Sequence, residues 1–178
     1  DYWWLTVDGL NSGQQYDFQY FVDGEYRVAD PFSKKVRASN DASLNEEYTV
    51  YPGLESYPAG KADGFVTVLQ PGQEDFNFSA FDPPPQDEMV VYELLLRDFL
   101  EQHSFSALTD TLDYLDRLGI NAIELMPVSN FGSNSSWGYN PNFHFALDKS
   151  YGTSKGFKQF VEEAHSRGIV VILDVVYN

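Results

Sequence analysis

One aspartate, Asp174, follows directly after a short apolar run. Residues 169–173 have the sequence IVVIL and are apolar on both faces, as expected of a parallel strand that is covered on both sides. A carboxylate at the end of such a strand lies at the carboxyl-terminal rim of the sheet, where α/β enzymes build their sites. We therefore predict that Asp174 belongs to a ligand-binding rim.

The chain has three histidines, His103, His144 and His165, and no cysteine. Their spacing does not suggest a metal site, and disulfides and thiolate metal sites are excluded. His165 is predicted on the solvated face of a helix. His144 lies in a long loop and is a candidate to reach a ligand.

The composition limits the classes of partner. With 27 acidic and 11 basic side chains the net charge is −16, so nucleic acid and anionic membrane surfaces would be repelled. No apolar run approaches membrane-spanning length, and we predict no membrane insertion. An aromatic content of 16% suits a β-rich core or surfaces that stack on flat ligands such as sugar rings.

The first half of the chain has the alternating pattern of antiparallel strands. Residues 16–22 are predicted to pair with residues 25–29 in a hairpin whose turn is Asp23-Gly24. Residues 65–69 and 76–78 are predicted closing strands. Three prolines at 83–85 suggest a stiff linker, because proline does not continue a central strand. The predicted domains are 1–82, the linker 83–88, and 89–178.

The second half changes to an alternation of strands and helices. Strands are predicted over 89–96, 120–126 and 169–173. A helix capped by Ser104 and ended by Gly119 carries apolar residues at helical spacing, and a second helix begins with Thr153 or Ser154 as its N-cap. Residues 128–153 are predicted to be a loop. This order suits parallel strands joined by crossover helices.

Four segments of this half resemble one family. They are VVYELLLRDF (90–99), LDRLGINAIELMPV (115–128), WGYNPNFHFALDKSYGT (137–153) and GIVVILDVVYN (168–178). In this order they resemble the first three strands and helices of the α-amylase superfamily barrel, glycoside hydrolase family 13. The first half, through residues 16–36, resembles the β-sandwich that precedes this barrel in isoamylases and branching enzymes. The resemblance implies an antiparallel β-sandwich followed by the first units of a TIM (β/α)₈ barrel.

The resemblance also implies roles for individual residues. Tyr139 resembles the tyrosine that stacks on the sugar at the site of cleavage; the alternative is an aromatic side chain that only packs on the barrel rim. Asp174 begins the segment that resembles the family's first signature, and its carboxylate would organise the rim. Asn178, in the same segment, resembles the asparagine that ligates a structural calcium ion in many members.

The family's catalytic carboxylates are implied at the ends of the fourth, fifth and seventh strands. Retaining glycosidases need a nucleophile and an acid about 5–5.5 Å apart, and those strands are not in this sequence. Glu93, Asp98 and Glu124 lie near strands and are more simply structural partners. We therefore expect no hydrolysis by this chain alone, although the parent protein would be a retaining enzyme.

The resulting hypothesis is a fragment of an α-glucan hydrolase or glucosyltransferase, extracellular or periplasmic, acting on starch, glycogen or maltooligosaccharide. One alternative is a non-catalytic starch-binding module that uses Trp3, Trp4 or tyrosines. A third possibility is that the first half only buttresses the barrel. Because an incomplete barrel leaves strand edges near 90–96 and 169–174, self-association is also expected.

Overall fold

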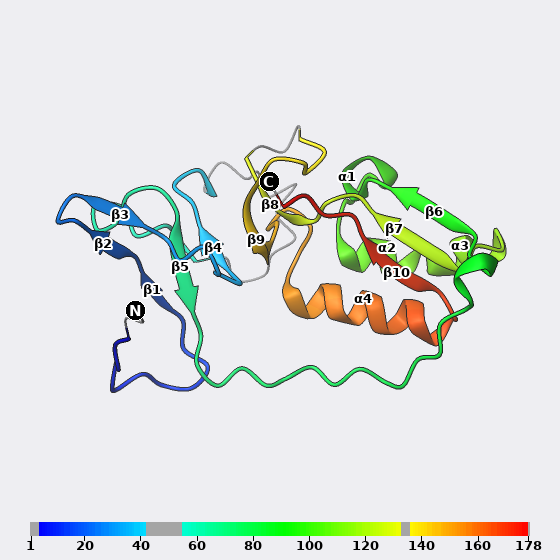
Figure 1. Cartoon of the computed structure of the whole chain (residues 1–178), viewed down its shortest axis with the longest axis horizontal. Coiled ribbons are helices and arrows are strands. Elements are labelled where there is room, and N and C mark those ends of the chain that lie inside the picture. Colours follow the sequence, from blue (N-terminus) through cyan, green and yellow to red (C-terminus); the bar gives the residue numbers. More distant parts are fainter. Residues whose placement is uncertain (1–3, 42–54, 133–135, 178) are drawn as a thin grey trace.

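The computed structural model describes residues 4–41, 55–132 and 136–177. The amino-terminal strands lie at one end of the molecule and the parallel sheet at the other, with the hairpin of β8 (Ser129–Phe131) and β9 (Pro141–Leu147) between them (Figure 1). Trp3 and Asn178 lie outside the described residues. No helix in the described part of the chain is long and apolar enough to cross a bilayer.

The amino-terminal strands form two small antiparallel units. A three-stranded sheet has the order β1-β5-β4, with β1 Tyr16–Phe18, β5 Val66–Leu69 and β4 Val36–Arg37. A hairpin pairs β2 (Tyr20–Val22) with β3 (Tyr26–Val28). The predicted turn is confirmed, because Asp23 and Gly24 both have positive φ (53° and 69°), as a tight hairpin turn requires.

Two details of this half differ from the sequence prediction. The strand predicted over 16–22 is interrupted at Gln19, whose side-chain amide donates to the carbonyl oxygen of Phe65 at 2.7 Å. The strand predicted over 65–69 is confirmed as β5, but 76–78 is not a strand. Within the described residues the strands make one sheet and one hairpin, so the two-layer sandwich remains a prediction.

Residues 70–85 connect the two halves without helix or strand and run along α4 (Ser154–Ser166) as far as the 3₁₀ helix η2 (Gln86–Glu88) (Figure 1). The Phe81 ring stacks on His165 with centroids 4.0 Å apart, and the Ser79 amide donates to the Glu162 carboxylate at 3.1 Å. The expectation that His165 is solvated is therefore wrong. Burial of this imidazole lowers its pKa.

The domain boundary predicted at the 83–88 linker stays a prediction.

The second half contains the predicted parallel sheet. Its order is β10-β7-β6, with β6 Val91–Leu94, β7 Ala122–Leu125 and β10 Val170–Leu173. Both pairings are parallel, and β7 lies between β6 and β10 in the sheet. Val91 on β6 and Leu173 on β10 are 46% and 42% exposed on the two edge strands. Self-association through these edges remains a prediction that light scattering would test.

Helices cover one face of this sheet (Figure 1), and α1 (Leu96–Phe99) is separated from the end of β6 by one residue. The helix predicted after Ser104 is split at Thr111 into α2 (Phe105–Asp110) and α3 (Leu112–Arg117). Its predicted cap is confirmed, because the Ser104 hydroxyl accepts from the Ala107 amide at 3.0 Å. The main core lies between sheet and helices and includes Leu94, Leu108, Leu112, Leu115, Ile123, Leu125, Phe160 and Ala164.

The choice of N-cap residue in α4 can be tested by mutation. The Thr153 hydroxyl accepts from the Gly156 amide at 3.0 Å, which selects Thr153 over Ser154 as the N-cap. Thr153→Ala is expected to lower the free energy of unfolding by about 1 kcal/mol, because the amide loses its partner. Ser154→Ala is the matched control and should change it by no more than a few tenths of a kcal/mol, since alanine suits a first helical position. Urea unfolding of both variants measures the difference; equal losses would place the cap elsewhere.

The loop predicted over 128–153 instead contains an antiparallel hairpin, which corrects that prediction. Strand β8 (Ser129–Phe131) pairs with β9 (Pro141–Leu147) through a register shifted on both sides of Asn130. The far side of β9 packs on the amino-terminal half, where Phe143 meets Phe65 with ring centroids 5.1 Å apart. The hairpin therefore joins the antiparallel half to the parallel half.

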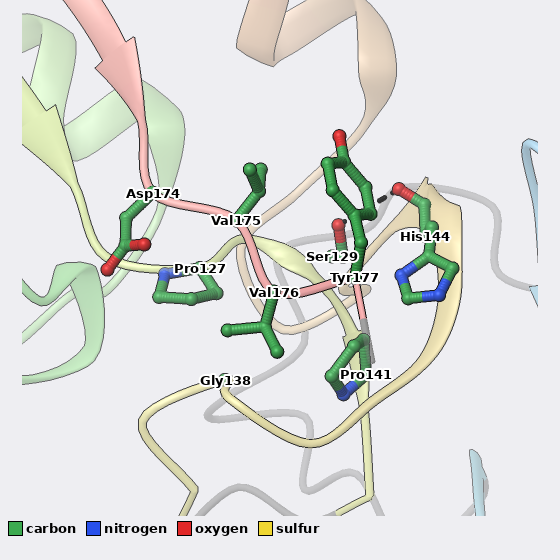
Figure 2. Close-up of a pocket in the computed structure, with 9 residues that line it drawn as sticks. All are labelled: Pro127, Ser129, Gly138, Pro141, His144, Asp174, Val175, Val176 and Tyr177. Atoms are coloured by element: carbon green, nitrogen blue, oxygen red, sulfur yellow. Dashed lines mark hydrogen bonds between the residues drawn. The ribbon is translucent and has the colours of Figure 1, made fainter.

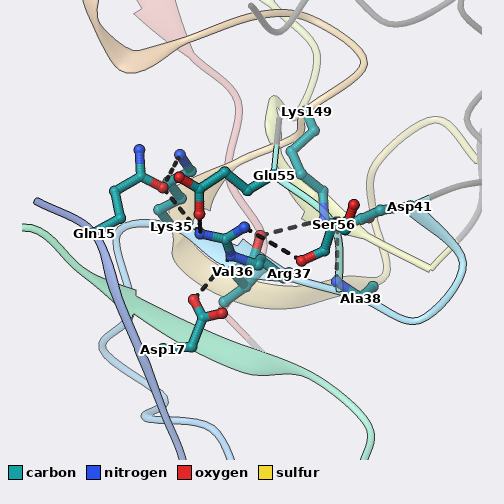
Figure 3. A network of polar contacts seen from close by, with 10 residues as sticks. All are labelled: Gln15, Asp17, Lys35, Val36, Arg37, Ala38, Asp41, Glu55, Ser56 and Lys149. Atoms are coloured by element: carbon teal, nitrogen blue, oxygen red, sulfur yellow. Dashed lines mark hydrogen bonds and ion pairs between the residues drawn. The ribbon is translucent and has the colours of Figure 1, made fainter. Parts of the chain in front are cut away.

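A buried ion pair adds to this junction. Lys149 Nζ lies 2.5 Å from Asp41 Oδ1, and both side chains are 6% exposed. Figure 3 shows this pair beside a second network, in which the buried Arg37 guanidinium lies 2.8 Å from Asp17 and 2.6 Å from Glu55. Two charged clusters thus lie at or next to the contact between the halves.

Candidate functional site

Asp174 lies at the carboxyl-terminal rim of the parallel sheet, where it was predicted. Its backbone amide donates to the carbonyl oxygen of Leu125 at 2.9 Å, which extends the β7–β10 ladder by one residue. The ladder fixes the Asp174 backbone, and its side chain is half-buried just past the last strand residue. The carboxylate is therefore held by regular structure, at the position where parallel sheets present side chains to ligands.

Tyr139 is brought to this carboxylate from a turn 35 residues earlier, and its phenol donates a hydrogen bond to Asp174 Oδ2. This bond and partial burial raise the pKa of Tyr139 to about 12, and the negative charges of Asp174, Glu93 and Glu124 add to the effect. The side chain remains 38% exposed. The rim thus presents a neutral, partly open aromatic ring whose hydroxyl is fixed to a carboxylate.

The turn that carries Tyr139 depends on a glycine. Gly138 has φ +94°, and a Cβ atom there would lie 2.5 Å from the carbonyl oxygen of Pro127, which follows β7. The Gly138 amide donates to the Ser136 hydroxyl at 2.9 Å. Only a residue without a side chain allows the turn to approach the end of β7 this closely.

His144 and Asp174 line one small pocket at the rim. Figure 2 shows Asp174 at one end of it and His144 at the other, with Pro127 and Val176 between them. The His144 ring meets the Tyr177 ring edge-on, with centroids 5.4 Å apart. The other lining residues are Ser129, Gly138, Pro141 and Val175. Asp174 and His144 thus line one pocket, and Tyr139 is hydrogen-bonded to Asp174.

Comparison with known proteins agrees with this geometry. Residues 100–178, which contain the rim, match the family model of the alpha-amylase catalytic domain. The carboxyl-terminal part of this chain is therefore similar to the alpha-amylase catalytic domain. Malto-oligosyltrehalose trehalohydrolase of Saccharolobus solfataricus is 31% identical over 177 residues, which cover 99% of this chain and 27% of that protein. The chain therefore spans about a quarter of the length of this curated relative.

Two solved structures are similar to most of the chain. The catalytic module of the glycogen-degrading pneumococcal virulence factor SpuA is 25% identical, with a TM-score of 0.65 over 94% of this chain and 28% of that one. Pullulanase of Group B Streptococcus, in complex with maltotetraose, is also 25% identical, with a TM-score of 0.60 over 85% of this chain and 23% of that one.

Two glutamates of the parallel sheet were interpreted from the sequence as structural partners. Glu93 on β6 and Glu124 on β7 are register partners, and they alternate with Leu94 and Leu125 of the helix-covered core. Their carboxylates therefore project from the sheet face opposite the helices. Their negative charges contribute to the raised pKa of Tyr139. The alternation of side chains along each strand, with Leu94 and Leu125 facing the core, is the sequence signal that would have predicted this orientation of the two glutamates.

The calcium ion implied by the resemblance finds no support in the residues described. Among residues 4–41, 55–132 and 136–177, no group of three His, Asp or Glu side chains could hold a metal ion. Asn178, the predicted ligand, lies outside these ranges. Calcium binding therefore remains a prediction.

Proposed function

We propose that this chain is part of an α-glucan-active enzyme, a hydrolase or glucosyltransferase of the retaining type, and that its rim binds the glucose unit at the site of cleavage. The observation that carries the proposal is the hydrogen bond from Tyr139 to Asp174 at the strand ends, inside the matched alpha-amylase segment. Relatives named as a trehalohydrolase and as a pullulanase with bound maltotetraose support this substrate class.

The chemistry of the rim suits a neutral sugar. The apolar face of a pyranose ring stacks on an aromatic side chain, and its hydroxyl groups need donors and acceptors nearby. The partly exposed ring of Tyr139 offers the stacking face, while Asp174 and His144 offer polar atoms around it. Because its phenol already donates to Asp174, Tyr139 stays fixed before a ligand arrives, which lowers the entropic cost of binding.

In a retaining mechanism this chain would bind and orient, and other residues would form and break bonds. The resemblance assigns the nucleophile and the acid to strands four and five of the barrel, beyond the three strands described here. The described strands would supply the wall on which the sugar rests. Whether water or another sugar accepts the glycosyl unit depends on residues outside this wall.

The first test is catalytic. Purified chain is expected to release no reducing ends from soluble starch or maltoheptaose, because the nucleophile and acid of a retaining enzyme are not in it. A protein that carries the complete barrel is the positive control. Sustained turnover by the chain alone, surviving repurification, would contradict this division of roles.

The non-catalytic binding module remains the second candidate, and one observation favours it. Tyr20 and Tyr26 stand on the same face of the β2–β3 hairpin and are 48% and 56% exposed. Native electrophoresis through a gel containing glycogen separates the two hypotheses. If the rim binds, Tyr139→Ala abolishes the retardation and Tyr26→Ala leaves it unchanged; the binding module predicts the reverse.

A further inference from the structure

An arginine that sequence patterns did not single out reaches the turn that carries Tyr139. Arg97 stands in α1, directly after the first parallel strand, and its Nη1 donates to the carbonyl oxygen of Ser136 at 2.9 Å. The two residues are 39 positions apart in the sequence. The contact therefore joins the end of β6 to the start of the turn formed by residues 136–140.

The guanidinium is oriented before it makes this contact. Its Nε lies 2.7 Å from Asp98 Oδ1 and its Nη2 lies 3.0 Å from Asp98 Oδ2, so the neighbouring carboxylate holds one edge of the planar group in two places. This pairing leaves Nη1 directed at Ser136. A bidentate pair fixes direction as well as distance, which a lysine ammonium would not do.

Ser136 connects the Arg97 contact to the rest of the turn. Its hydroxyl accepts from the Gly138 amide at 2.9 Å, and Gly138 packs closely on Pro127 just after β7. The next residue is Tyr139, whose phenol meets Asp174 after β10. The turn is thus held at the ends of all three parallel strands, and Arg97 supplies the anchor at β6.

We infer that Arg97 is a positioning residue, which holds the 136–140 turn so that the Tyr139 phenol meets Asp174 at the rim. Only its kinetic consequence rests on the proposed function. The effect on the Tyr139–Asp174 contact follows from the geometry of this chain and is measurable without a substrate.

The ionisation of Tyr139 reports on this contact. The charged groups that act on the phenol are Asp174, Glu93 and Glu124, and all of them oppose ionisation. With a pKa of about 12, roughly one tenth of Tyr139 is ionised at about pH 11. If Arg97→Met lets the turn move away from Asp174, the pKa falls toward the ordinary value of about 10 and most of the phenol ionises at this pH.

The sign of the shift separates positioning from a lost charge. Removing a cation disfavours the phenolate, so the lost charge of Arg97 alone would raise the pKa of Tyr139 or leave it unchanged. Movement of the turn away from Asp174 would instead lower the pKa of Tyr139. The two explanations therefore predict opposite results for the same variant.

The experiment uses the full chain with ¹³C-labelled tyrosine ring carbons, titrated by NMR, with Tyr139→Phe to assign the signal. Arg97→Met is compared with Arg167→Met, which removes a surface arginine paired with Asp113 and Glu163 on the helices. A fall in the Tyr139 pKa in Arg97→Met but not in Arg167→Met supports the inference. An unchanged or raised value overturns it.

A second variant covers the case in which Arg97→Met does not fold, as judged by circular dichroism. Arg97→Lys keeps the charge and most of the side-chain length but loses the fork, and it should lower the pKa of Tyr139 in part. If the pKa of Tyr139 in Arg97→Lys equals its value in the wild-type chain, the inference is overturned.

Kinetics in a protein with the complete barrel then test the link to function. If Arg97 acts through Tyr139, Arg97→Met lowers kcat/KM on maltooligosaccharides about tenfold or more, and has little further effect when Tyr139 is already alanine. A lowered Tyr139 pKa with unchanged kinetics leaves the positioning role standing and contradicts the stacking role in the proposed function. The two failures are therefore distinguishable.

Discussion

Replacing Lys149 by methionine is expected to lower the free energy of unfolding by about 3–5 kcal/mol, because it leaves a buried carboxylate without its cation. Lys149 and Asp41 are each 6% exposed and lie 2.5 Å apart. Lys149 Nζ also donates to the carbonyl oxygen of Val36 at 3.3 Å, and Asp41 accepts from the Ala38 amide at 2.8 Å. One substitution therefore disturbs a polar cluster inside the junction between the two halves.

The double variant Lys149→Met/Asp41→Leu is the matched comparison. Replacing both charges by apolar groups removes the unpaired carboxylate, so most of the lost stability should return. Urea unfolding measures the free energy of unfolding of the wild-type chain, of Lys149→Met and of the double variant. A loss below about 1 kcal/mol in Lys149→Met, the range of exposed ion pairs, would show that this pair is hydrated and does not hold the junction.

Replacing Gly138 by alanine is expected to lower the free energy of unfolding by about 2–5 kcal/mol and to disrupt the Tyr139 contact. The residue has φ +94°, which costs a side chain about 1–2 kcal/mol. The new Cβ would also lie 2.5 Å from the Pro127 oxygen and 2.8 Å from its Cβ, and such overpacking costs about 1–3 kcal/mol more. The turn must move, and Tyr139 moves with it.

Gly119 provides the control for this variant. It has φ +79° at the end of α3, and an added Cβ would meet nothing within 4 Å. Gly119→Ala therefore measures the backbone cost alone. We expect urea unfolding to show a larger loss for Gly138→Ala, and NMR titration to show a lower Tyr139 pKa only in that variant. Equal losses with an unchanged Tyr139 pKa would mean that the turn absorbs the methyl group without moving.

The sequence predicted those parts of the fold and site that depend on neighbours in the chain. Asp174 was placed at a rim because an apolar run precedes it, and Ser104, Gly119 and the Asp23-Gly24 turn were found from local capping and turn chemistry. The likeness to a family supplied Tyr139, and the place of His144 in a long loop made it a candidate. Their positions at one rim agree with that likeness, whereas their roles in binding remain proposals.

The parts that were missed depend on partners distant in the sequence. Strand β8 has three residues and pairs through an irregular register, so no alternation marks it. Lys149 and Asp41 are 108 residues apart, and Arg97 and Ser136 are 39 apart. The split at Thr111 was missed because the apolar spacing continues through it. The two charged contacts and the β8–β9 pairing depend on segments that fold back on one another, which local periodicity does not report.

The binding of a glucan at the rim is tested most directly by titrating the ¹⁵N-labelled chain with maltotetraose and following backbone amide signals by NMR. Cellotetraose, its β-linked counterpart, is the ligand control, and Tyr139→Ala is the protein control. We expect shifts centred on Gly138, Tyr139, His144 and residues 174–177, which are weaker with cellotetraose and absent in Tyr139→Ala. Shifts confined to the β2–β3 hairpin around Tyr26, or rim signals that do not respond to maltotetraose, would contradict a glucan site at this rim.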